Sequence, residues 1–281
     1  MAGDAFTIRP MRADEIALAM DWAAAEGWNP GLHDAVCFAT VDPEGFLIGA
    51  LDGKPAATIS CVNYDDRFAF LGCYIVRPDL RGRGFGLALW QAAIAHAGAR
   101  TIGLDGVVAQ QDNYRKSGFV LAYRNIRHGG RVAARGARPG TVPLGDIPLS
   151  VIAADDATVF PAPRLDFLRA WIGTTGHMGR ALVRDGALMA WGVIRPCRQG
   201  FKVGPLVADD RAAAEGVLDA LIDAVGGGEV FLDVPEPNRD AVALAQSRGL
   251  APVFETARMY TGPVRDLAVH RIFGVTTFEL G

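Results

Sequence analysis

The chain has 281 residues, so one large domain or two of ordinary size are both open, and two is the better expectation. Hydrophobic residues make up 50% and charged residues 21% of the sequence, a composition that excludes a disordered or fibrous chain. The formal net charge is -3, which excludes an overall basic field that would attract nucleic acid or acidic lipid.

The cysteine and histidine patterns indicate no metal site. The four cysteines form no CxxC pair, which favours unpaired packing residues in a reducing cytoplasm over disulfides or zinc ligands, and the five histidines are scattered. Charges within residues 1–12 argue against a signal peptide, and no apolar run approaches the roughly 20 residues of a membrane span. We therefore expect a soluble cytoplasmic protein without a bound metal.

The first half of the sequence alternates predicted strands and helices. Asp52-Gly53 lies between two apolar runs and predicts the turn of a β-hairpin. Ile16, Met20 and Ala23 recur at helix spacing. In chain order we expect strands at 7–9, 46–51, 56–62, 68–76, 102–108 and 120–125, and helices from Ala13, over 87–97 and over 111–117.

A stretch rich in Gly, Pro and Arg at 128–148 has no apolar period, which predicts a linker or a long connecting loop. We therefore expect two domains, at 1–135 and 136–281. The second half repeats the order of the first, with a helix at 164–171, a hairpin turning at Asp185-Gly186, a strand ending at Val207, a helix at 212–225 and a strand at 230–234.

Two short segments support an internal duplication. Leu104-Asp105 matches Leu232-Asp233, and residues 117–119 match residues 248–250, each at the same point in the order of elements. We prefer two similar domains in tandem to the alternative that these matches are coincidental.

The segment at 76–89 runs from a strand through a glycine-rich turn into a helix. Gly82, Gly84 and Gly86 would let the backbone approach a phosphate, and the helix N-terminus and Arg81 and Arg83 would add positive charge. The spacing is neither the Gly-x-Gly-x-x-Gly of a dinucleotide site nor a P-loop with its Gly-Lys-Ser/Thr. It predicts an anion cradle of another kind, the alternative being an ordinary strand-to-helix turn.

This cradle resembles the acyl-CoA pyrophosphate loop of the GCN5-related N-acetyltransferases (GNAT), whose pattern is Arg/Gln-x-x-Gly-x-Gly/Ala. Tyr114 to Phe119 is similar to that family's Tyr-x-x-x-Gly-Phe segment. The resemblance covers about residues 5 to 127, the second half looks like a diverged copy, and the tandem arrangement resembles a bacterial subgroup of two-domain acetyltransferases. It implies an α/β fold with mixed sheets, that is, two GNAT folds in tandem.

The resemblance also implies roles for particular residues. The end of the strand would hydrogen-bond the pantetheine arm of acetyl-CoA, and the turn would hold its pyrophosphate. Tyr114 would give a proton to the departing thiolate, since a phenol of pKa near 10 is protonated at pH 7. The implied cofactor-binding residues are Tyr74, Ile75, Val76, Arg81, Gly82, Arg83, Gly84, Phe85, Gly86, Leu87 and Asn113.

The group that takes the proton of the acceptor amine is unassigned. Several family members carry a glutamate eleven residues before the loop motif, where this chain has Phe70. Glu26, Asp65 and Asp66 lie in loops expected to border the acceptor, although each of them could simply be solvated. Trp28 could line the acceptor pocket or fill the core.

The second half lacks these features. Acidic Asp209 and Asp210 stand where the cradle would be, and Ala245 stands in the place of Tyr114, so we expect one acyl-CoA site per chain. The second domain would then shape the acceptor pocket or build a homodimer.

The resemblance as a whole implies an N-acetyltransferase that moves acetyl from acetyl-CoA directly to a primary amine, most simply that of a small molecule. A metabolite amine, an antibiotic, a polyamine and a peptide amine all remain open as acceptors. We expect neither nucleic acid nor membrane as a partner. The alternatives are a non-catalytic acyl-CoA sensor and, more remotely, a purely structural tandem domain.

Overall fold

The computed structural model describes residues 6–136 and 140–281; positions 137–139 of the expected linker lie outside the described residues. The strands are β1 (Phe6–Pro10), β2 (Phe46–Leu51), β3 (Lys54–Asn63), β4 (Phe68–Val76), β5 (Thr101–Val107), β6 (Val120–Val132), β7 (Thr141–Pro143), β8 (Met178–Arg184), β9 (Ala187–Pro196), β10 (Phe201–Ala208), β11 (Gly228–Pro235), β12 (Ala251–Tyr260) and β13 (Ile272–Gly274). The helices are α1 (Ile16–Ala25), α2 (Asp34–Phe38), α3 (Phe85–Ala97), α4 (Gln111–Lys116), α5 (Leu149–Asp156), α6 (Leu165–Gly173), α7 (Arg211–Ala224) and α8 (Arg239–Ser247), with short 3-10 turns between them.

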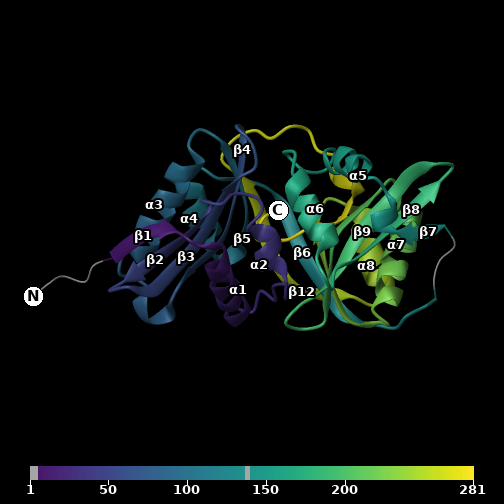
Figure 1. Ribbon diagram of the computed structural model, residues 1–281, viewed down its shortest axis with the longest axis horizontal. Helices are drawn as coiled ribbons and strands as arrows, with labels where there is room; N and C mark the ends of the chain where they lie inside the picture. The colour runs from purple at the N-terminus through teal and green to yellow at the C-terminus, as the bar shows by residue number, and fades with distance from the viewer. Residues whose placement is uncertain (1–5, 137–139) are drawn as a thin grey trace, which may run out of the picture.

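The described residues form the expected α/β class, but the sheets of the two halves join into one mixed sheet of 13 strands. Its order is β1-β2-β3-β4-β5-β12-β6-β11-β10-β9-β8-β7, with β13 added against β10. Figure 1 shows the first half of the chain on the left and the second half on the right, with the last residues between them. None of the described helices is long and apolar enough to cross a membrane.

The two predicted hairpins are confirmed. Asp52 and Gly53 both have positive φ, 50° and 75°, between β2 and β3. Asp185 and Gly186 repeat this geometry between β8 and β9, with φ of 51° and 79°. Positive φ at both central residues is the two-residue turn whose twist suits an antiparallel pair.

The prediction of a linker throughout 128–148 is wrong. The predicted strand at 120–125 continues to Val132 as β6, and β7 and a 3-10 turn at Leu144–Asp146 occupy part of the remainder. Gly129 and Gly130 carry no side chain, so the alternation of apolar and polar residues typical of a strand is missing from the sequence here. The absent side chains leave room for the Phe231 ring and the Gly249 carbonyl. Hydrogen bonding to β11 and β12 on both edges fixes this segment as a strand.

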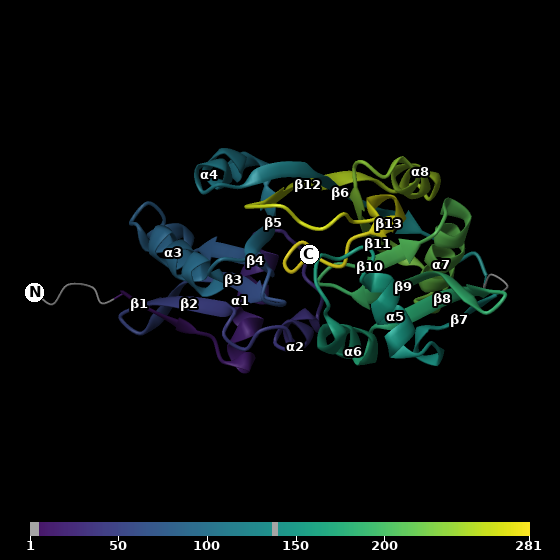
Figure 2. The same ribbon diagram turned by 90° about the horizontal axis from the view of Figure 1, so that it is seen from above.

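The two halves exchange strands. β12, from the second half, pairs with β5 of the first, and β6, from the first half, pairs with β11 of the second. β6 and β12 also pair with each other, and Figure 2 shows them running together across the top of both halves. The boundary at 135 remains a prediction, but neither half completes its sheet with its own strands alone.

Each exchanged strand forms one buried ion pair with the half that it joins. Arg258 on β12 binds Asp105 on β5 with a shortest N–O distance of 2.6 Å, and Arg127 on β6 binds Asp233 on β11 at 2.7 Å. The two aspartates are those of the matching Leu-Asp segments. The equivalent pairs support the internal duplication that the sequence predicts.

The sheet opens at the same point in each half. The parallel pairing of β4 with β5 ends at Leu71 and Leu104, and that of β10 with β11 ends at Val203 and Leu232. Beyond these pairs the neighbouring strands separate, and this opening positions the candidate site.

Candidate functional site

The glycine-rich turn forms an exposed cradle before α3. Gly82 and Gly84 have φ of 77° and 86°, a region that L side chains rarely adopt. Gly84 is the N-cap of α3 and offers no side chain, so the first amides of a 13-residue helix have no side-chain acceptor. Uncapped amides and the helix dipole favour an anion at this place.

Gly86 is required by close packing. A Cβ atom on this residue would lie 2.6 Å from the Tyr74 hydroxyl oxygen and 3.0 Å from a methyl carbon of Val76. The glycine therefore lets the start of α3 rest directly on the end of β4. This contact joins the predicted pyrophosphate end of the site to the predicted pantetheine end.

Arg81 ties the cradle to its surroundings. Its Nε donates to the Val76 carbonyl at 2.9 Å, and its Nη2 donates to Glu26 Oε1 at 2.5 Å. Arg83 is exposed and lies over the Phe85 ring at 5.0 Å. Glu26 thus lies at the arginine of the cradle, where its carboxylate would compete with a phosphate for Arg81.

One edge of the end of β4 is free of strand pairing within the described residues. A bulge interrupts its pairing with β3, and Cys73 within it has a φ of 49°. Ile75 and Val76 then pair with β3 on one side, while β5 has already separated on the other. The edge of residues 74–76 faces an opening in which an extended ligand could add hydrogen bonds as a strand would.

In the second half, the chain itself fills the equivalent opening. β13 pairs with β10, Gly274 opposite Leu206 and Ile272 opposite Val207. Counted from the last parallel pair of each half, Leu206 and Val207 correspond to Tyr74 and Ile75. The amide of Val275 also donates to the Asp233 carbonyl on β11 at 2.9 Å, so this opening is bridged from both sides.

The helix after β10 is capped where α3 is not. Asp210 Oδ1 accepts from the Ala213 amide at 2.8 Å at the N-terminus of α7. The predicted counterpart of Tyr114 is confirmed, because Leu250 donates to the Ala245 carbonyl as Phe119 donates to the Tyr114 carbonyl, both at 3.1 Å. The second half thus has a capped helix, a filled opening and no phenol.

Tyr114 lies beside the open edge of the first half. Its ring stacks on Trp90, with centroids 5.8 Å apart, and covers Gly106 on β5 so closely that a Cβ there would be 2.2 Å from a ring carbon. Tyr74, on the opposite strand, packs on the same Trp90 at 5.5 Å. Burial, with a smaller contribution from Tyr74, raises the pKa of Tyr114 to about 12, so the phenol keeps its proton at neutral pH.

The other predicted residues are scattered around this centre. The Asn113 amide donates to Gln110 Oε1 at 2.7 Å, and Leu87 is exposed on α3. Trp28 is half-buried and its carbonyl accepts from Arg127. Asp65 accepts from the amides of Arg67 and Phe68 in the β3–β4 turn, and Asp66 is exposed beside it, so both lie at the end of β4 remote from the cradle.

Sequence reasoning missed the segment 275–281, which crosses both halves. A Cβ on Gly204 would lie 2.4 Å from the Val275 carbonyl oxygen, and one on Gly72 would lie 2.1 Å from that of Glu279. Gly72 and Gly204 each directly follow the last parallel pair of their half. This matched pair of glycines was the one signal in the sequence for a backbone crossing at both places.

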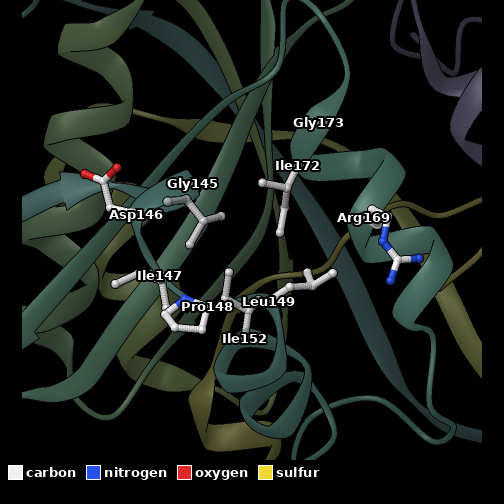
Figure 3. A pocket seen from close by; sticks show the side chains of 10 residues that line it. Gly145, Asp146, Ile147, Pro148, Leu149, Ile152, Arg169, Ile172 and Gly173 are labelled. Atoms are coloured by element: carbon white, nitrogen blue, oxygen red, sulfur yellow. The ribbon is translucent and has the colours of Figure 1, made fainter.

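A separate hollow of about 410 Å³ lies in the second half, between α5 and α6. Figure 3 places Ile172 across it from Ile152, with Arg169 to one side. None of the predicted site residues lines it. Within 6–136 and 140–281, no group of three or more His, Cys, Asp or Glu residues could hold a metal ion.

Two family models match the chain. Residues 14–119 match the acetyltransferase (GNAT) family, and residues 152–274 match an acetyltransferase (GNAT) domain. The second match lies in the half that lacks the cradle, which agrees with a diverged copy.

Several similar proteins match this chain over nearly its whole length and over nearly their own. The chain is 31% identical to a holothin acyltransferase of Pseudoalteromonas sp. (strain SANK 73390), over 98% of this chain and 95% of that one. It resembles a putative acetyltransferase of Pyrococcus horikoshii (TM-score 0.84, 24% identity, 100% and 98% of the two chains) and a tandem GNAT protein from the clavulanic acid biosynthesis pathway (TM-score 0.64, 16%, 92% and 99%). The chain therefore belongs to the GNAT acetyltransferases, as a tandem member, and is an acyltransferase.

Proposed function

We propose that this acyltransferase is a cytoplasmic N-acetyltransferase that moves the acetyl group of acetyl-CoA directly to a primary amine of a small molecule. The observation that carries the proposal is the free edge of β4 at 74–76, next to an uncapped helix N-terminus. The filled, capped counterpart in the second half indicates what such an opening accommodates, namely an extended chain with hydrogen-bonding groups.

The residues present fit acetyl-CoA. The amides of residues 82–87 and the side chains of Arg81 and Arg83 would hold the pyrophosphate, with Arg81 leaving Glu26. The edge at Tyr74 and Ile75 would bind the pantetheine arm. Bound acetyl-CoA supplies an activated acyl group as a thioester.

Tyr114 is suited to assist the departure of the thiol. It lies on α4 beside the opening, with its ring over Gly106 of β5. Its raised pKa keeps a proton available to the sulfur. The amine must attack in its neutral form, because an ammonium has no lone pair. A second group must therefore accept a proton on the acceptor side.

A small-molecule acceptor is supported by the relative named for holothin, since its likeness runs through both halves. The cytoplasmic setting is supported by the four cysteines, each buried and unpaired within the described chain. The second half would shape the acceptor side, because the 275–281 segment and the Arg127–Asp233 ion pair link it to the first half.

Thiol release with acetyl-CoA tests this function. Purified protein is assayed against holothin and a panel of primary amines that includes polyamines and a peptide with a free N-terminus. The proposal predicts amine-dependent release and a product heavier by one acetyl group. Tight acetyl-CoA binding without release for any amine would contradict it and favour a sensor.

A further inference from the structure

The segment 275–281 brings one carboxylate to the centre of the molecule. Figure 2 shows the last residues of the chain lying between the two halves, beneath β12. The backbone of Glu279 lies against Gly72, at the point where β4 separates from β5. The Tyr64 hydroxyl and the Arg164 guanidinium bind the carbonyls of Leu280 and Gly281 and fix the segment directly after this contact.

The Glu279 side chain is buried, and one of its two carboxylate oxygens has no direct partner. The residue is 3% exposed, and Oε2 accepts no hydrogen bond from any described residue. Leaving a carboxylate oxygen unpaired in the interior costs several kcal/mol, so such atoms are rare and call for an explanation. Simple packing does not explain it, because an apolar side chain would avoid this penalty.

Further unpartnered polar atoms come from both halves. Lys202 Nζ and Arg195 Nη1, on adjacent strands in direct register, are fully buried and without an acceptor for these atoms. Ser60 Oγ, opposite Gly72 on β3, has no nitrogen or oxygen partner and lies beside the Cys73 thiol. The groups that act electrostatically with Glu279 are Cys73, Arg127, Arg195 and Lys202.

The segment that carries Glu279 and the Tyr114 ring pack on opposite faces of the sheet beside the opening. Leu71 and Tyr114 pack in the hydrophobic cluster under α3. Cys73 packs in the other cluster, with Phe278 and Leu280. A thioester held along residues 74–76 would therefore have the phenol on one side and the carboxylate on the other.

We propose that Glu279 is the general base of the acyl transfer, a role that rests on the proposed function. The Glu279 carboxylate accepts the proton of the amine, directly or through one water molecule, as the C–N bond forms. The C–S bond breaks, and the thiolate takes its proton from Tyr114. Solvent then removes the proton from Glu279 and restores that of Tyr114, which closes the balance.

The test compares Glu279→Gln, Glu279→Asp and the control Glu255→Gln, which removes an exposed carboxylate on β12. With an amine that the wild type acetylates, Glu279→Gln should lower kcat at least 100-fold, with the Kd for acetyl-CoA and the Tm near the wild-type values. Glu279→Asp should keep part of the activity, and Glu255→Gln all of it. An alkoxyamine analogue of the same acceptor gives up its N–H proton far more readily once the C–N bond forms, because an alkoxyammonium group is a much stronger acid than an alkylammonium group. With this analogue the deficit of Glu279→Gln should shrink at least tenfold.

Each outcome decides the matter. Activity of Glu279→Gln within threefold of the wild type overturns the role, as does an equal deficit for both acceptors. If the Gln variant fails to fold, a Glu279→Asp variant that folds and has no activity overturns the role. A wild type that releases no thiol with any amine overturns the proposed function first.

Discussion

The two halves of the chain share one architecture and differ at one place. In both, a parallel pair of strands separates after a leucine or valine, and a glycine follows. In the second half β13 occupies the opening and Asp210 caps the next helix. In the first half the edge of residues 74–76 is free and the N-cap is Gly84.

The difference shows how a duplicated fold can keep its shape while one copy fills the opening that the other leaves unpaired. A strand of the chain satisfies in the second half the backbone groups that a ligand would satisfy in the first. An Asp side chain likewise takes the place of an anion at the helix N-terminus. The second copy is then free to support the first through exchanged strands and the 275–281 segment.

The largest effect should come from breaking the exchanged ion pairs. Arg258→Met and Arg127→Met each leave a buried aspartate without its partner, so each should lower the free energy of unfolding by about 3–5 kcal/mol. The control is Arg124→Met. Its exposed pair with Glu255 joins β6 to β12, the two strands that carry the buried arginines. Urea unfolding measures all three, and equal small losses would contradict the structural equivalence of the two halves.

The cradle should distinguish the halves by ligand affinity. Gly84→Val places a β-branched residue at a φ of 86° and narrows the anion site, so it should weaken acetyl-CoA binding at least 100-fold. Gly186→Val introduces similar strain, at a φ of 79° in a turn of the second half. Calorimetry should find unchanged affinity in this control; a similar loss in both variants would show that strain alone is responsible.

Tyr114→Phe should lower kcat about 100-fold and leave the acetyl-CoA affinity within threefold, because it removes a proton donor and little packing. Since burial raises the pKa of Tyr114 to about 12, wild-type kcat should show no loss from its ionisation up to about pH 10. Steady-state rates from pH 7 to pH 10 measure both effects. Unchanged turnover in the variant would remove the proposed acid.

The crossing segment should give the smallest effect on stability but a sharp contrast in activity. Gly72→Ala and Gly204→Ala each force a methyl group toward a backbone carbonyl, so each should destabilise the protein by about 2 kcal/mol. Only Gly72→Ala displaces Glu279, so it should also lower kcat, while Gly204→Ala should not. Equal kcat in the two variants would argue against a special role for the Gly72 crossing.

Much of this architecture could be predicted from local patterns. The hairpin turns at Asp52 and Asp185 depend on two residues each, and the cradle depends on Arg81 and glycines within a few positions. Tyr114 and its counterpart Ala245 were found because each has a fixed distance from a glycine. These features are written in short stretches of sequence, so short-range reasoning finds them.

The rest depends on contacts between distant segments. β6 pairs with β11 and β12, and nothing in its own residues names those partners. β13 spans only residues 272–274, and it is a strand only because it pairs with β10 in the opening that it fills. Glu279 lies between Phe278 and Leu280 in the sequence, where an acidic residue would ordinarily mark a solvated position; only the two glycines beneath the segment reveal its burial.

The most direct measurement is the number of acetyl-CoA molecules bound per chain, obtained by calorimetric titration of the wild type and of Gly84→Val. The structure predicts one molecule per wild-type chain, held by the first half. For Gly84→Val it predicts binding at least 100-fold weaker and no second, unaffected site. Two molecules per chain, or undiminished binding by Gly84→Val, would contradict the claim that only the first half keeps an open acyl-CoA site.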